Sequence, residues 1–191
     1  MPVFIPQKYI PDIEMYLTGR YIGLASMGNY EISNSLFIPM YYAVKILELL
    51  GEEDPNVVIL PHQLNWAVPK SKEDLKNFGI ASLYHLVSGL KSANYAIENE
   101  IKDWISDRLK DCMSEDGGFT ITPKIYPPYL ESTYFGMKLA SILGLKLEND
   151  FVENTKEFVS MLQNEDGGFR RSLYIGISTL ENSYFASKLL W

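Results

Sequence analysis

Two glutamates, Glu131 and Glu181, are the first candidates for chemistry, because they occupy the same place in two copies of a repeated segment. Paired carboxylates can serve as general acid and base when burial or a like-charged neighbour raises the pKa of one of them. Each also has a simpler structural interpretation. Glu181 has capping-box spacing with Ser178, and Glu131 lies near a helix start, where a carboxylate favours the macrodipole. His85 completes the candidate catalytic set and is otherwise a helix histidine near the core surface.

Tyrosines and lysines also recur at matching positions of the chain. The tyrosines are most simply core residues whose hydroxyls meet a neighbouring turn, but their rings could also line a ligand pocket. Each lysine lies four residues after a tyrosine, and cations at one repeat position could bind a diphosphate or carboxylate. More often such a lysine occupies the polar stripe of a buried helix, with its head in water. The residues are Tyr41, Tyr84, Tyr134 and Tyr184, with Lys45, Lys138 and Lys188.

These residues are positioned by a segment that occurs twice. SEDGGF at 114–119 returns as NEDGGF at 164–169, and LESTYFGMKLA at 130–140 returns as LENSYFASKLL at 180–190. A fixed period of this length indicates stacked supersecondary units. Apolar residues at helical spacing stand on both sides of the glycines, so each copy predicts a helix, a turn and a second helix. Glycine permits the positive φ that such a reversal needs, and we expect Gly117 and Gly168 at these turns.

Weaker copies of the same plan precede the clear ones. The pattern predicts one all-α domain over residues 1–191, built from about four antiparallel helical hairpins. Proline at three positions between 55 and 69 predicts a short or broken first helix in the second hairpin. The expected units, numbered one to four, span about residues 8–51, 52–92, 93–144 and 150–191.

The repeated residues resemble the repeat shared by protein prenyltransferase β subunits and squalene/hopene-type terpene cyclases. The segment Gln163-Asn-Glu-Asp-Gly-Gly-Phe169 fits the cyclases' Q-x3-G-x-W pattern with Phe in place of Trp. The segment from Cys112 to Phe119 fits without the Gln, and the helix that follows each turn matches as well. The resemblance implies an α/α toroid whose second helices line an inner ring. Four hairpins would make a partial ring or a small closed one.

The catalytic groups that this resemblance implies are incomplete in the sequence. Glu131 and Glu181 occupy the position of the zinc-binding Asp of prenyltransferases, and Thr133 and Ser183 occupy the position of the zinc-binding Cys. His85 does occupy the position of the zinc-binding His. One histidine without a thiolate is a poor zinc site, so we expect no metal and no other cofactor. The sequence also lacks the acidic D-x-D-D run of the cyclases and the aspartate-rich runs that hold magnesium.

The composition of the chain argues against some classes of binding partner. The net charge of −7 and the pI of about 4.9 argue against nucleic acid and anionic membrane surfaces. No apolar run is long enough to predict a membrane span. The single cysteine, Cys112, and an opening without a signal-peptide pattern predict a cytoplasmic protein.

Three functions remain open, and the sequence does not decide whether the protein is an enzyme. An aromatic-lined cavity would suit an isoprenoid or another apolar ligand, and aromatic faces can stabilise carbocations. A non-catalytic interaction or scaffold module is the alternative, because open ends of the array expose apolar surface. A carbohydrate-active α/α-toroid enzyme would need two carboxylates across one cleft. We also expect a homodimer or a second subunit, covering the apolar run from Leu180 to Trp191.

Overall fold

Helices provide all the regular secondary structure of the part of the chain that the computed structural model describes, which is residues 38, 41–46, 48–49, 68–76, 78–174 and 176–190. The predicted all-α class is therefore confirmed. Residues 41–46 and 48–49 are helical, while Trp191 and most of units one and two before residue 68 lie outside the described residues. The named elements are η3 (Lys72–Leu75), α3 (Ile80–Ser92), α4 (Asn99–Lys110), α5 (Leu130–Leu143), α6 (Asn149–Met161) and α7 (Leu180–Leu190).

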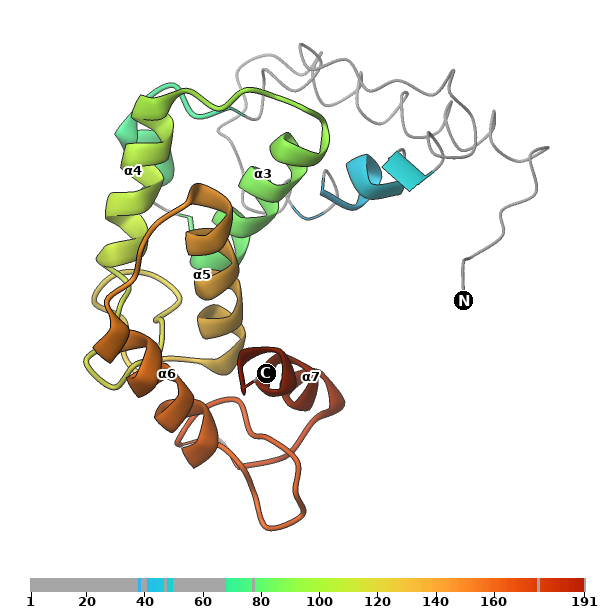
Figure 1. The fold of residues 1–191 in the computed structure, drawn as a ribbon, viewed down its shortest axis with the longest axis vertical. Coiled ribbons are helices and arrows are strands. Elements are labelled where there is room, and N and C mark those ends of the chain that lie inside the picture. The colour runs from blue at the N-terminus through green and yellow to red at the C-terminus, as the bar shows by residue number, and fades with distance from the viewer. Residues whose placement is uncertain are drawn as a thin grey trace, which may run out of the picture.

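The helices form two layers along an arc. The second helices of units two, three and four are α3, α5 and α7, and α5 packs against both of the others. Figure 1 shows these three following one another along the arc, with the first-type helices α4 and α6 on its outer side. Units three and four thus each pair an outer with an inner helix, as in the toroid-like array of antiparallel hairpins that the sequence predicts.

The Gly-Gly turns that join the two helices of a unit have the same backbone geometry in units three and four. The first glycine of each pair has positive φ, +85° at Gly117 and +81° at Gly167. Its amide donates to the carbonyl three residues earlier, at 3.0 Å from Gly117 to Ser114 and 2.9 Å from Gly167 to Asn164. Gly168 lies in the turn as expected, and its carbonyl accepts from the amide of Asn164 at 2.8 Å, but the left-handed residue of this pair is Gly167.

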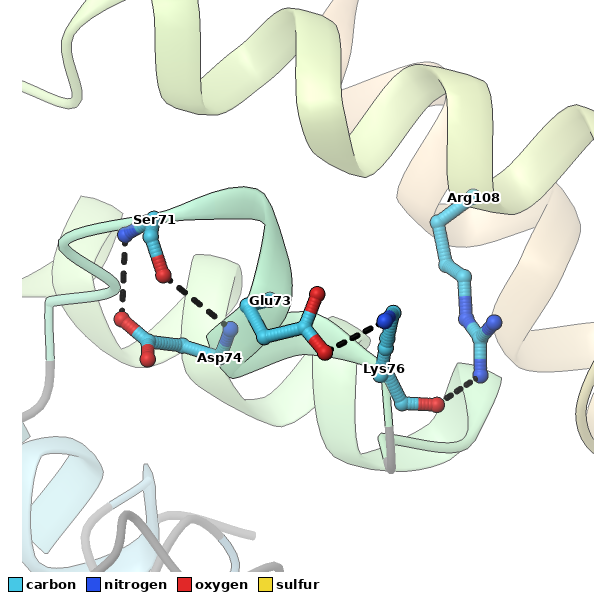
Figure 2. Close-up of polar contacts among 5 residues, drawn as sticks. All are labelled: Ser71, Glu73, Asp74, Lys76 and Arg108. Atoms are coloured by element: carbon cyan, nitrogen blue, oxygen red, sulfur yellow. Dashed lines mark hydrogen bonds and ion pairs between the residues drawn. The ribbon is translucent and has the colours of Figure 1, made fainter.

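The described part of unit two, from residue 68, contains a short helix that is fixed to unit three by polar contacts. This helix is the four-residue η3, whose start is capped reciprocally by Ser71 and Asp74. The expected short or broken first helix of unit two depends mainly on residues before 68, which lie outside the described residues. Figure 2 shows this capping box, the Glu73–Lys76 ion pair and the guanidinium of Arg108, which donates to the carbonyl of Lys76. Because Arg108 belongs to α4, this contact positions α3, which follows η3, beside unit three.

The hydrophobic core is divided between the junctions of neighbouring units. One cluster lies mainly between units two and three, and a smaller one lies between units three and four. Each hairpin therefore buries apolar surface against its neighbour as well as within itself, as expected for a repeat array. Fully buried members of the first cluster include Leu83, Leu86, Ile105, Phe119 and Leu139, and of the second Leu130, Phe158, Val159 and Leu162.

Membrane insertion has no helical candidate in this part of the chain. None of the helices formed by the described residues is long and apolar enough to cross a bilayer.

Candidate functional site

Aromatic rings from all four units form one continuous row on the inner helices, which we call the aromatic row. Each unit supplies two adjacent residues. The first is the repeated tyrosine, and the second lies next to it in the sequence. The first positions are Tyr41, Tyr84, Tyr134 and Tyr184, and the second positions are Tyr42, His85, Phe135 and Phe185.

Ring contacts cross every junction between units. The ring centroids of Tyr41 and Tyr84 are 6.1 Å apart, those of Tyr84 and Phe135 4.9 Å, and those of Phe135 and Phe185 5.7 Å. These separations are typical of favourable aromatic pairs. The structure thus brings together the four tyrosines singled out by the sequence, and it adds a second position at which sequence reasoning had singled out only His85. The same offset of fifty residues links His85, Phe135 and Phe185, so the signal was present.

Two tyrosines of the row, Tyr41 and Tyr134, are held in the neutral form. Burial, and next the neighbouring Tyr84, raise the pKa of Tyr41 to about 12. Burial and a hydrogen bond with Tyr184 also raise the pKa of Tyr134. Tyrosines with raised pKa values keep their protons at neutral pH, so they can donate a hydrogen bond but cannot act as bases. The row therefore offers apolar ring faces with a few neutral hydroxyl donors.

His85 is the only imidazole among the rings of the row. It is 6% exposed and touches the rings of Tyr41 and Phe135, with centroids 5.2 and 5.1 Å away. Its Nδ1 lies 2.6 Å from the carbonyl oxygen of Ala81, and because a carbonyl only accepts, Nδ1 carries the proton and Nε2 the lone pair. Burial lowers the pKa of His85, and the bond to Ala81 opposes this in part. The ring is therefore neutral at physiological pH.

Two of the three repeated lysines lie against the tyrosine one helical turn before them. The ammonium of Lys138 is 5.8 Å from the ring centroid of Tyr134, and that of Lys188 is 5.7 Å from Tyr184. These distances fit cation–π contacts. Lys45 instead pairs with Glu48 at 2.7 Å. The two cations next to the tyrosines are exposed, so they stand at the edge of the row with their heads open to solvent.

The two candidate carboxylates have different surroundings. Glu131 forms a 3.7 Å ion pair with Arg171, whose guanidinium also lies 4.7 Å from the ring centroid of Tyr129. Glu181 is exposed, and no lysine or arginine of the described residues forms an ion pair with it. Neither glutamate is one of the residues of the row, so His85 is the only member of the candidate catalytic set that lies there.

The start of α7 is capped differently from the sequence prediction. The hydroxyl of Thr179 accepts a 3.0 Å hydrogen bond from the amide of Asn182. Ser178 donates instead to Asp166, at 2.7 Å. The predicted capping box between Ser178 and Glu181 is therefore wrong, because the helix starts one residue later and Ser178 serves the Gly-Gly turn.

The residues at the zinc-ligand positions form hydrogen bonds that hold the Gly-Gly turns against the inner helices. Thr133, at the expected cysteine position, accepts a 2.9 Å hydrogen bond from the amide of Phe119 and donates to the carbonyl of Tyr129 at 2.8 Å. Ser183 makes the same kind of bond to the amide of Phe169, at 3.1 Å. In the part of the chain that is described, no three His, Cys, Asp or Glu side chains gather as metal ligands. The hydroxyls of Thr133 and Ser183 therefore have a structural role that needs no metal.

Two cavities lie away from the aromatic row. A wide groove of about 740 Å³ is formed by the unit-four turn and the loop after it, from Gln163 to Ser178. A smaller one, of about 310 Å³, lies beside α4 and is lined in part by Trp104 and Tyr95. Neither is lined by the inner helices.

A comparison with protein families agrees with this architecture. The family model described as prenyltransferase alpha-alpha toroid domain matches residues 53–191, which is well over half of the chain. No curated protein matches the chain.

Proposed function

Because this chain belongs to the prenyltransferase alpha-alpha toroid family, we propose that its aromatic row binds the apolar chain of an isoprenoid or a similar ligand. The observation that carries the proposal is the continuity of the row through all four units. Ligand sites are mostly apolar surfaces with a few polar groups that fix orientation, and the row has this composition.

Separate parts of the row suit separate parts of such a ligand. The ring faces of Tyr84 and Phe135 would contact the hydrocarbon. Lys138 and Lys188, at the edge of the row, would favour an anionic head group such as a diphosphate. If the protein is an enzyme, His85 is the strongest candidate for proton transfer, since its Nε2 holds a lone pair among the rings. Glu131 and Glu181 are the weaker candidates, because neither belongs to the row.

Binding of a fluorescent farnesyl alcohol tests the proposal directly. We expect saturable binding, and we expect Tyr84→Ala to weaken it by about tenfold, since a well-placed aromatic contact contributes roughly 1 kcal/mol or more. Tyr84 is only half-buried, so its truncation should leave the fold intact.

The matched control is Tyr126→Ala, because Tyr126 is an exposed tyrosine on the loop before α5, outside the row. It should bind the probe like the wild type. Absence of saturable binding, or equal loss in both variants, would refute the proposal.

A non-catalytic interaction module is the second candidate function. The observation that favours it is the exposure of large apolar residues at the unit-four end, above all Leu180 at 93% and Ile177 at 75%. Exposed apolar side chains at the start of α7 and on the loop before it suit contact with a partner. Measurement of association, rather than of ligand binding, tests the interaction-module function. Formation of a homodimer would be one form of this function.

A further inference from the structure

The smaller of the two cavities lies at the start of α4, on the outer side of the arc (Figure 1), and we call it the outer pocket. Its volume of about 310 Å³ is at the lower end of the range found for ligand sites. None of the residues that line it belongs to the aromatic row. Binding at the outer pocket would therefore be separate from the function proposed for the inner helices.

The inner part of the outer pocket is apolar and aromatic. Pro69 and Ile101 are buried there. The half-buried rings of Tyr95 and Trp104 pack against the core cluster between units two and three and also line the cavity. Both rings are therefore held in place by the core while part of their surface faces the pocket. Aromatic ring faces attract cations, and the indole of tryptophan does so most strongly.

The charged residues of the outer pocket are exposed to solvent, so they stand at its opening. They are two carboxylates, Glu98 and Glu100, and one ammonium, Lys70. Among the described residues, none of these three side chains takes part in an ion pair. The side chain of Glu98 also makes no capping hydrogen bond at the start of α4. The pocket thus combines an excess of negative charge with two aromatic surfaces.

The start of α6 shows which of these features belong to the repeat. Glu148 and Asp150 lie fifty residues after the two acids of the outer pocket, so acidic residues at the start of an outer helix favour the helix macrodipole in both units. The aromatic positions are not repeated, because Leu145 and Asn154 stand where unit three has its tyrosine and tryptophan. The combination of acids with aromatic rings is therefore particular to unit three.

We propose that the outer pocket binds an alkylated ammonium group, with its methyl groups against Trp104 and Tyr95 and its charge beside Glu98 and Glu100. Such a group can contact ring faces and carboxylates at the same time. A bare ammonium is strongly hydrated and suits the apolar part of the pocket less well, and an anion would be repelled by the two carboxylates. Two sources share this chemistry, a free quaternary ammonium compound and the trimethylated lysine of a peptide.

Isothermal titration calorimetry of the full chain with choline, and with a short peptide that contains trimethyllysine, tests the proposal. We expect saturable binding of at least one of these probes, and the probe that binds identifies the source. The neutral counterparts are dimethylbutanol, which is isosteric with choline, and the same peptide with norleucine in place of the modified lysine. They should bind about tenfold more weakly or not at all, because they lack the charge.

Substitutions of the exposed charged side chains test the assigned residues without disturbing the fold. Replacing both acids, in Glu98→Gln/Glu100→Gln, should weaken binding by about tenfold, since two favourable charge interactions are lost. Lys70→Ala should strengthen binding by about twofold, because it removes a like charge from the opening. The matched control is Glu148→Gln/Asp150→Asn, which removes the equivalent acids of unit four and should leave binding unchanged.

The aromatic surface is tested by Trp104→Leu, since leucine keeps an apolar side chain but has no ring face. It should weaken binding by about fivefold, and circular dichroism checks that the fold is retained. If this variant does not fold, the charge variants decide. The proposal is overturned if neither probe binds, if the neutral counterparts bind equally well, or if a folded Trp104→Leu binds like the wild type. Equal losses in the two double variants, or weaker binding in Lys70→Ala, would overturn it as well.

Discussion

Units three and four carry nearly the same residues around the turn and along the inner helix, but they differ in what lies next to them. Unit three has neighbours on both sides, and its Tyr134 is 9% exposed, whereas the equivalent Tyr184 in unit four is 52% exposed. The backbone of the turn and the start of the inner helix are the same in both. Local geometry is therefore set by the repeated sequence itself, while burial is supplied by the following unit.

Hydrogen bonds show how much of a unit is self-contained. In each unit the hydroxyl one turn into the inner helix accepts from the amide of the phenylalanine that follows the glycines, Thr133 from Phe119 and Ser183 from Phe169. That bond is present with or without a following unit. The internal structure of the two units is therefore nearly the same. A difference in stability between equivalent substitutions in units three and four measures the energy of the junction between the units.

The largest expected difference concerns the two left-handed glycines. Gly117→Ala should cost about 3–5 kcal/mol of unfolding free energy, because positive φ strain adds to a clash with the backbone of α6. Gly167→Ala carries the φ strain without the clash and should cost about 1–2 kcal/mol. Urea denaturation of both variants measures the difference. Equal losses would mean that α6 does not pack on Gly117 in solution.

The second contrast concerns the leucines at the start of the inner helices. Leu130→Ala should cost about 2–5 kcal/mol, since it opens a cavity in the core between units three and four. Leu180→Ala should change the stability of a single chain by less than about 0.5 kcal/mol. Thermal unfolding at low protein concentration compares them without the contribution of association. A large loss from Leu180→Ala under these conditions would show that another part of the same chain covers the side chain of Leu180.

The third contrast isolates the repeated hydroxyl. Thr133→Val keeps the shape of the side chain but leaves the buried amide of Phe119 without an acceptor, at a cost of about 1–3 kcal/mol. Ser183→Ala removes the same bond where Phe169 is only half-buried and water can replace the hydroxyl, so we expect less than about 1 kcal/mol. Urea titration measures the loss of unfolding free energy in both variants. A larger loss from Ser183→Ala than from Thr133→Val would contradict the burial of Phe119 and the partial exposure of Phe169.

The sequence was sufficient for the fold because the fifty-residue period is carried by the residues that set local geometry. The glycine pairs and the apolar spacing predict the hairpins, and the offset of fifty predicts that the tyrosines are equivalent. Which glycine takes positive φ was not predicted, since both residues of a pair are glycine and only the turn hydrogen bonds distinguish Gly167 from Gly168.

The site was less predictable than the fold for a different physical reason. Burial depends on the following unit, so identical motifs gave no sign that Leu130 is enclosed and Leu180 is exposed. The helix start at Thr179 was missed because Ser178 and Thr179 are both good capping residues, and the bond from Ser178 to Asp166 decides between them. The roles of Glu131, Glu181 and the lysines in chemistry stay predictions.

The smallest expected effect extends the comparison to unit two, where His85 takes the position held by Phe135 and Phe185 in units three and four. Burial lowers the pKa of His85 in the folded chain below its ordinary value, so below about pH 6.5 the unfolded chain binds a proton more readily. The free energy of unfolding should therefore fall as pH drops through that value, with the full stabilisation present above it. His85→Phe should remove this part of the pH dependence between pH 7.5 and 5.5, while His62→Gln, at the only other histidine in the sequence, should retain it. Urea unfolding across this range gives the slopes, and identical slopes for His85→Phe and the wild type would mean that the imidazole is not held neutral within the aromatic row.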